Sequence, residues 1–145
     1  MLNLLQRIQS GEAQPPPVAK LIGFDIAEVE EGRAVVHFEA GEQHWNPMGG
    51  LHGGILCDVA DAAMGIAYAS TLGEGEYFST VELKINFLRP FKTGRLIAEG
   101  IVTNSGRTLG YVECEVRDED GRLIAKSSST CMTLRSTNGA TNGGA

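Results

Sequence analysis

The sequence lacks the features that mark several large classes of protein. No apolar run among its 145 residues approaches the roughly 20 residues that a membrane-spanning helix needs. The net charge is −6 and the basic residues form no stripe, which disfavours a nucleic-acid partner. The first 17 residues have neither a basic start nor a continuous apolar core, so they do not resemble a secretory signal. We expect no nucleic-acid partner and no membrane partner.

Cysteine is scarce, and its spacing excludes two further classes. The three cysteines, Cys57, Cys114 and Cys131, are odd in number and widely separated. They form no CxxC pair and no cysteine–histidine spacing of a zinc site, and neither His37 nor His44 shows ligand spacing. Reduced thiols of this kind are typical of the cytoplasm. We expect a cytoplasmic protein with no metal site and no cofactor.

Amphipathic patterns predict one domain with two short ends. Charged residues make up 21% and apolar residues 42%, as in globular chains. Residues 1–10 have the pattern of a short helix, and the prolines within Ser10–Pro17 predict an irregular linker. We expect an N-terminal short helix and linker over residues 1–20, one domain over 21–135 and a disordered tail over 136–145.

Six segments alternate apolar with polar residues, as half-buried antiparallel strands do. Two precede a helical pattern at residues 53–69 and four follow it: FDIAEVEEG, RAVVHFEA, FSTVELKINFLRP, RLIAEGIVTNS, TLGYVECEVRD and RLIAKSSSTCMTLR. Turn residues link neighbouring strands at Glu31-Gly32, Lys92–Gly94, Asn104–Gly106 and Asp118–Gly121. One helix covers six strands only if the sheet curls around it. The predicted class is α+β, a curved antiparallel sheet wrapped around one long central helix.

The helical segment has no charged outer face of mixed sign. Its apolar face is broad and contains Ile55, Leu56, Val59, Ala60, Ala63, Met64 and Ala67. The opposite face holds Asp58 and Asp61 among small residues, and no Lys, Arg or Glu occurs between His52 and Leu72. Helices without such a face are generally buried all round, so we expect a partner subunit to cover it. A carboxylate there is either a catalytic base or nucleophile, or a capping or rim residue.

Glycines surround the start of the same helix. Gly49, Gly50, Gly53 and Gly54 flank His52, so a ligand can approach the backbone there. The first amides of a helix have no internal acceptor, and the helix dipole places about half a positive charge on them. Such donors suit a carbonyl oxygen that becomes an oxyanion. With an acid two turns further on, the pattern favours acyl chemistry over a plain glycine-rich turn.

This region resembles the motif of hotdog-fold acyl-CoA thioesterases of the phenylacetate-degradation (PaaI-like) type. The residues that carry the resemblance are Asn46, His52, Gly53, Gly54 and Asp61. The segments STVELKINFLRP and DGRLIAKSSSTCMTL resemble later strands of that family, so the likeness spans residues 20–135. The family fold is a sheet wrapped on one helix and paired through dimerisation, which agrees with the predicted architecture.

The resemblance implies a role for each residue of the motif. Asp61 would be the general base that activates water, or the nucleophile. The Gly53 amide would polarise the thioester carbonyl, His52 would help to orient that group, and Asn46 would position the water or the acid. Family sites lie at the dimer interface, so Asn46, His52 and Gly53 of one chain would face Asp61 of the other. A homodimer, and commonly a homotetramer, is thereby implied.

In this family a hydroxyl on the third strand usually supports the acid. Thr80 is the expected residue, because it shares a face with Glu82 while the alternate residues Val81, Leu83, Ile85 and Phe87 point into the core. Ser79 stays open, since a one-residue register error reverses the two faces.

The remaining predicted substrate contacts surround this motif. Gly54 adjoins the proposed carbonyl donor, and Trp45 would line the acyl pocket unless it serves only in packing. Arg89 and Arg107, like Lys92, lie at strand ends from which they reach the CoA phosphates, or they are solvated surface charges.

Three functions follow from these observations, and hydrolysis of an acyl-CoA thioester is the leading one. The first alternative is a hotdog 3-hydroxyacyl dehydratase or hydratase, in which His52 and Asp61 would pair for proton transfer at carbon. The second is a non-catalytic acyl-CoA-binding protein on the same fold. The acyl group cannot be read from the sequence, and neither can the part played by Asp58. A mechanism with Cys57 as nucleophile is disfavoured.

Overall fold

The computed structural model describes residues 1–135, so the tail predicted to be disordered, 136–145, lies outside the described residues. One antiparallel sheet has the strand order β1-β2-β4-β5-β6-β3. Its strands are β1 (Phe24–Glu30), β2 (Arg33–Ala40), β3 (Glu76–Phe87), β4 (Gly94–Ser105), β5 (Leu109–Asp118) and β6 (Leu123–Arg135). The helices are α1 (Leu2–Gln9), α2 (Pro17–Ile22) and α3 (Gly53–Ala69), with a 3₁₀ turn at Glu42–His44.

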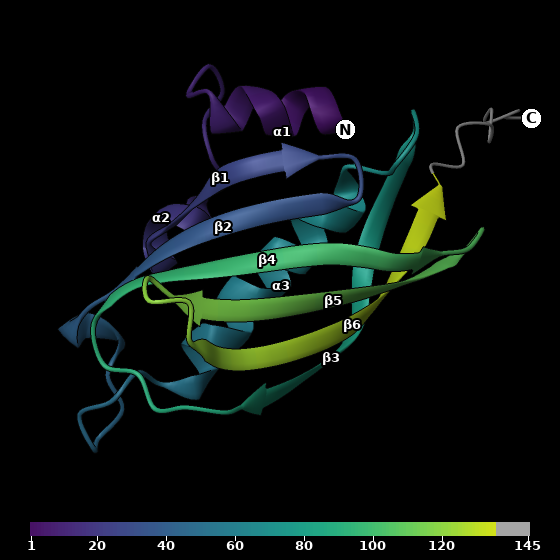
Figure 1. Cartoon of the computed structure of the whole chain (residues 1–145). Coiled ribbons are helices and arrows are strands. Elements are labelled where there is room, and N and C mark those ends of the chain that lie inside the picture. The colour runs from purple at the N-terminus through teal and green to yellow at the C-terminus, as the bar shows by residue number, and fades with distance from the viewer. Residues whose placement is uncertain (136–145) are drawn as a thin grey trace, which may run out of the picture.

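The sheet curves around α3, which lies against one face of it (Figure 1). This confirms the predicted α+β class and the predicted helix at residues 53–69. Within residues 1–135, no helix is both long enough and apolar enough to cross a membrane.

Small residues on both surfaces bring α3 close to the sheet. Val59, Ala63 and Met64 on the helix are fully buried. The backbone of Ala63 and Met64 lies over Gly100 of β4, where an added Cβ would lie 2.6 Å from the carbonyl carbon of Ala63 and 2.9 Å from the amide nitrogen of Met64. Because both neighbours are backbone atoms, only glycine fits at this point of contact. The distance between the helix and the middle of the sheet is therefore fixed.

Tyr68 holds the other end of the helix against β5 and β6. Its ring is buried and lies so close to Gly110 that a side chain there would overlap it. The hydroxyl group shares a hydrogen bond of 2.7 Å with Thr133, and Phe78 of β3 meets the ring edge-on at 5.7 Å. The polar tip of a buried tyrosine is thus satisfied, which avoids a desolvation cost of about 1–3 kcal/mol.

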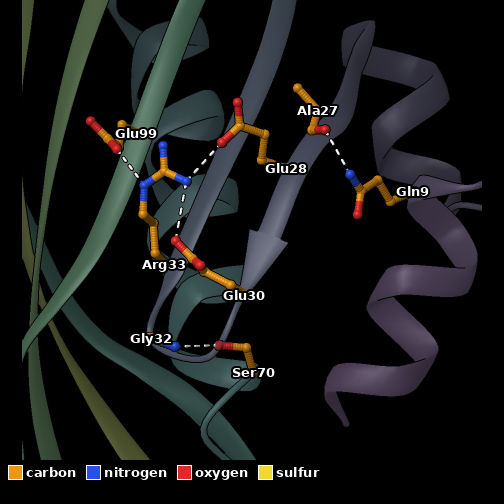
Figure 2. Close-up of polar contacts among 8 residues, drawn as sticks. All are labelled: Gln9, Ala27, Glu28, Glu30, Gly32, Arg33, Ser70 and Glu99. Carbon is orange, nitrogen blue, oxygen red and sulfur yellow. Dashed lines mark hydrogen bonds and ion pairs between the residues drawn. The ribbon is translucent and has the colours of Figure 1, made fainter.

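Polar contacts connect the β1–β2 turn with its surroundings (Figure 2). The amide of Gly32 donates to Ser70 Oγ at 2.8 Å, which links the turn to the end of α3. The Arg33 guanidinium donates to Glu28 at 2.7 Å and to Glu99 at 2.5 Å. These hydrogen bonds, with Glu28 contributing most, raise the pKa of Arg33 above its already high usual value. Arg33 therefore joins β1, β2 and β4 on the outer surface of the sheet.

The N-terminal segment packs against the edge of the sheet. Figure 1 shows α1 lying along β1, where the Gln9 side chain donates to the Ala27 carbonyl at 2.8 Å and Leu5 is buried. The predicted linker reached Pro17, but Pro17 begins α2. Proline fits the first turn of a helix because no acceptor is needed for its missing N–H. The covered edge of the sheet is therefore β1.

A β-bulge in β3 makes one sequence prediction wrong. Thr80 pairs with Cys131 and Glu82 pairs with Thr130, so Val81 is an extra residue without a partner of its own. Val81 was predicted to lie in the core, but it is 56% exposed. A bulge reverses the alternation of faces from that point on.

The bulge places two pairs of β3 residues on the helix side that strict alternation would separate. Phe78 and Thr80 precede it and contact α3 residues, whereas Leu83 and Ile85 follow it and pack against the core. Phe87, also predicted to be in the core, is 54% exposed and lies beside Gly53. Leu83 and Ile85 are thus the two core predictions for this strand that the structure confirms.

We predict that Gly100→Ala destabilises the fold strongly. The new methyl group meets backbone on the helix, so the helix and sheet must separate, at a cost of about 2–3 kcal/mol or more. Gly73→Ala is the control, because an added Cβ there finds ordinary contact distances in an exposed turn. Urea denaturation measures both free energies of unfolding. Equal stability of the two variants would contradict the packing described for Gly100.

Candidate functional site

Asp61 lies half-buried at the middle of α3, on the side facing β3. Its Oδ1 atom accepts a hydrogen bond of 3.0 Å from the hydroxyl of Thr80. The bulge at Val81 is what turns Thr80 toward the helix while Leu83 still faces the core. Thr80 was the expected residue, although the alternation used to choose it placed Thr80 and Val81 on the wrong faces of the strand. Ser79 is exposed on the opposite face of β3 and does not meet Asp61.

An apolar groove of about 290 Å³ extends from Asp61 and Thr80. Part of its wall comes from α3 and β3, including Gly65 and Phe78. The rest comes from the N-terminal segment and the start of β1, namely Leu5, Pro16, Val18 and Phe24. The sequence offered no signal that these residues meet α3, because they belong to a predicted short helix, a linker and a strand far from it in the chain. One end of the open helix face is therefore covered by the chain itself.

The glycine-rich end of α3 forms a second, separate cavity of about 390 Å³. Its lining includes Asn46, Gly53, Phe87 and Arg89. Within residues 1–135, the Gly53 amide has no hydrogen-bond acceptor, whereas the Gly54 amide donates to His52 Nδ1 at 2.9 Å. Gly53 thus offers the free donor that the helix start was expected to present, and Gly54 does not.

His52 and Asn46 are both occupied in part by the backbone. His52 is exposed and caps α3 through Nδ1, so only its Nε2 edge faces a ligand. Asn46 Oδ1 accepts from the amides of Met48 at 2.9 Å and Gly50 at 3.2 Å. This leaves the Asn46 side-chain NH₂ as a donor. Both residues therefore shape the loop that presents Gly53, and both keep one donor for a bound group.

The two cavities lie apart on one helix. Gly53 and Asp61 are separated by eight residues, or about 12 Å along the axis at 1.5 Å per residue. Between them runs a stripe of small or half-exposed residues: Gly53, Gly54, Cys57, Asp58, Asp61 and Ala62. A hydrogen-bond donor and a base that act on one carbonyl must both lie within about 3 Å of the reacting atoms. The Gly53 amide and the Asp61 carboxylate of one chain therefore cannot serve the same carbonyl.

The other predicted contacts lie at the edges of the site. Trp45 donates to the Lys92 carbonyl at 2.9 Å, and the Lys92 ammonium lies 4.6 Å from the centre of its ring. Trp45 thus packs on the β3–β4 connection and lines neither cavity. Arg89 lines the Gly53 cavity, whereas Arg107 lies on the β4–β5 loop, near the Ser79 end of β3. The structure does not bring the two arginines of one protomer together.

Asp58 and the cysteines lack the environment of catalytic groups. Asp58 is exposed and has no hydrogen bond or ion pair within the described residues. Burial, with Asp58 and Asp61 adding to it, raises the pKa of the Cys57 thiol. Burial likewise raises the pKa of Cys131 and brings that of Cys114 to about 12. A thiol with a raised pKa is protonated at neutral pH and is a poor nucleophile.

The described residues contain no group of three or more His, Cys, Asp or Glu side chains placed to hold a metal ion. His44, which precedes the glycine-rich loop, is buried and structural. Its Nδ1 accepts from the Gly41 amide at 3.1 Å, and its Nε2 lies 2.8 Å from the Ile22 carbonyl.

Comparisons with known proteins point to one family. Residues 48–125 match the sequence profile of the Thioesterase superfamily. The chain is 38% identical over 118 residues to a protein of Saccharolobus solfataricus named as a candidate esterase, covering 81% of this chain and 84% of that one. The acyl-coenzyme A thioesterase PaaI of Escherichia coli is 33% identical over 108 residues, covering 74% of this chain and 75% of that one.

A solved structure agrees with these relatives. The PaaI protein from the phenylacetic acid degradation operon of Escherichia coli superimposes with a TM-score of 0.81 and 26% sequence identity, over 92% of this chain and 95% of that chain. The region matched by the profile contains the glycine-rich start of α3, Asp61 and Thr80. This chain belongs to the thioesterase superfamily, as a PaaI-like member with the hotdog fold.

Proposed function

We propose that the protein hydrolyses acyl-CoA thioesters at a site built from two copies of the chain. One observation supports this most directly: the free Gly53 amide and the Asp61 carboxylate lie in separate cavities on one exposed stripe of α3. Each half is chemically incomplete. A second copy supplies the missing half, as the resemblance to PaaI-like enzymes implied.

A two-fold axis brings the halves together in a simple way. In an isologous contact, if residue i of one chain meets residue j of the other, then j also meets i. Two α3 helices that cross antiparallel near Cys57 therefore place each Gly53 opposite the partner's Asp61. Small residues such as Gly54 and Ala62 allow the backbones to approach closely. Two identical sites result from one dimer.

The free edge of the sheet supports the same pairing. β3 is a 12-residue edge strand, and in the described structure its outer side has no neighbouring strand. Long unpaired edges are rare in natural proteins because they invite association. The opposite edge, β1, is already covered by α1. Pairing of β3 with its copy would extend the sheet across the dimer.

The chemistry follows from the position of each group. The thioester oxygen accepts a hydrogen bond from the Gly53 amide, which is where negative charge develops when the carbonyl is attacked. Asp61, held by Thr80, takes a proton from the attacking water. The tetrahedral intermediate collapses, the carbon–sulfur bond breaks, and the CoA thiolate leaves and takes up a proton. The products are the free carboxylic acid and CoA.

Two arginines at the edge of the site carry the charge that the phosphates of CoA require. Arg89 belongs to the Gly53 half, and Arg107 lies on the β4–β5 loop, near the first residues of β3. In the proposed dimer, one arginine from each subunit approaches the same site. Within residues 1–135, the Arg89 side chain makes no ion pair, so it is free to bind phosphate.

Dehydration of a 3-hydroxyacyl group is less well supported. That reaction needs a histidine that can take a proton from carbon. His52 Nδ1 already accepts the Gly54 amide, so a neutral His52 carries its proton on Nε2. In that form it donates a hydrogen bond and does not abstract a proton.

We predict that Asp61→Asn lowers kcat for thiol release from an acyl-CoA panel by about 10²-fold or more, the usual contribution of a general base. Asp58→Asn, one turn away and exposed, is the matched control and keeps wild-type turnover. Thiol release followed with a chromogenic disulfide measures both variants. Wild-type turnover by Asp61→Asn would rule out the proposed base. A large loss in Asp58→Asn alone would move the role to that residue.

Thr80 acts by positioning Asp61, so its two closest replacements should differ. Thr80→Val keeps the shape but removes the hydroxyl donor, and we expect kcat to fall about tenfold with little change in KM, because a hydrogen bond to a charged group contributes about 1.5–3 kcal/mol. Thr80→Ser keeps the donor and should retain most of the activity. If Ser and Val reduce kcat equally, the loss reflects packing and not the hydrogen bond.

Mixing two inactive variants tests whether the site is shared. Gly53→Ala places a methyl group 2.8 Å from the Phe87 ring and disturbs the donor end, while Asp61→Asn removes the base. Heterodimers formed by refolding the variants together contain one intact site, so roughly a quarter of wild-type activity should return in a 1:1 mixture. No recovery, with heterodimers verified by mass spectrometry, would place both groups of each site within one chain.

A further inference from the structure

An apolar cavity lies under α1, beside the Asp61 groove. Its volume is about 410 Å³, and α1, the proline segment, α2 and β1 enclose it. Most of its lining is apolar and includes Leu4, Ile8, Ala19 and Ile26. Among the described residues, Asp25 is the only charged one in that lining. A cavity of this size and composition is typical of a small-molecule site.

This cavity adjoins the groove that contains the proposed base. Four residues line both spaces, namely Leu5, Pro16, Phe24 and Ile66. Asp61 and Thr80 line the groove but not the cavity. The two spaces therefore lie side by side, and the residues between them are mostly apolar.

We propose that the groove and the cavity together form the acyl pocket, and that the preferred substrates carry straight-chain acyl groups of medium length. This inference rests on the proposed function. The thioester carbonyl must lie at Asp61, and the acyl chain is bonded directly to that carbonyl. The chain therefore enters the groove first and the cavity next. A flexible chain can pass the shared residues into the second space, whereas a rigid aromatic ring stops in the first.

The charge of the lining selects against acyl groups that carry a second carboxylate. Asp25 lies on β1 at the cavity and is exposed, and no Lys or Arg among the described residues lines either space. A second carboxylate at the far end of an acyl group would meet this aspartate without a cation to pair with. Dicarboxylic acyl groups, such as glutaryl, are therefore excluded.

Ala19 sets the depth of the pocket. It is 4% exposed on α2 and lines the cavity but not the Asp61 groove. A larger side chain at this position fills the cavity and leaves the groove open. Leu21 lies two residues further on the same helix and is 80% exposed, so its enlargement changes neither space. These two positions form a matched pair.

The test is the chain-length profile of thiol release from acetyl- to dodecanoyl-CoA. For the wild type we expect kcat/KM to rise about fourfold for each added methylene until the cavity is full. Ala19→Leu should lower kcat/KM for decanoyl-CoA about tenfold or more and change that for butyryl-CoA less than about twofold. Leu21→Phe should match the wild type throughout. Phenylacetyl-CoA should react alike with all three proteins.

A second variant tests the same cavity if Ala19→Leu does not fold. If thermal denaturation shows that Ala19→Leu does not fold, Ile8→Phe fills the same cavity from α1 and should shorten the profile in the same way. A uniform loss for all chain lengths in a folded variant would overturn the proposal. So would a wild-type preference for phenylacetyl-CoA or glutaryl-CoA over decanoyl-CoA.

Failure of the proposed function is distinguishable from failure of the pocket. If no acyl-CoA releases thiol, the hydrolase proposal is wrong, and calorimetric titration with the neutral probe decanamide then tests the pocket alone. Binding to the wild type that weakens about tenfold in Ala19→Leu, but not in Leu21→Phe, supports the pocket. Equal binding to all three proteins, or no binding to any, overturns it.

Discussion

The close packing of α3 against the sheet is the constraint on which the rest of the structure depends. Gly100 and Gly110 carry no side chain where the helix backbone and the Tyr68 ring press on the strands. Because this packing fixes the distance between the helix and the sheet, it also fixes which face of the helix is buried. The stripe that carries Gly53 and Asp61 must then face away from the middle of the sheet, where a substrate or a second helix can reach it.

The site depends in turn on an irregularity of β3. A regular strand places residues two apart on one face, so Thr80 and Leu83 would lie on opposite faces. The extra residue at Val81 lets Thr80 meet Asp61 while Leu83 still packs in the core. Bulges are frequent beside active sites because they redirect a side chain without breaking the sheet. Because of the bulge, β3 supplies both the hydrogen bond from Thr80 to Asp61 and the apolar side chain of Leu83 to the core.

Much of this could be predicted from local patterns. The 17-residue helix and the six strands appeared as periods of 3.6 and 2, because burial on one face leaves that trace in a sequence. The resemblance to the PaaI-like motif singled out Asp61 and Gly53, since residue type and spacing alone left Asp58 and the neighbouring glycines open. The N-terminal wall of the pocket could not be predicted, because Leu5, Pro16 and Val18 line one groove with α3 and β3 residues more than 40 positions away. No local period records such a contact.

The sequence by itself determined the fold class and the long helix, because both follow from periodicity that short segments contain in full. The resemblance to the PaaI-like motif singled out Gly53 and Asp61 at the start and middle of that helix. Only the tertiary structure decided which β3 hydroxyl meets Asp61, that Gly54 is occupied by His52 while Gly53 is free, and that the proline segment lines a cavity. These outcomes depend on how distant segments approach one another, and a shift of one residue in a strand reverses its faces.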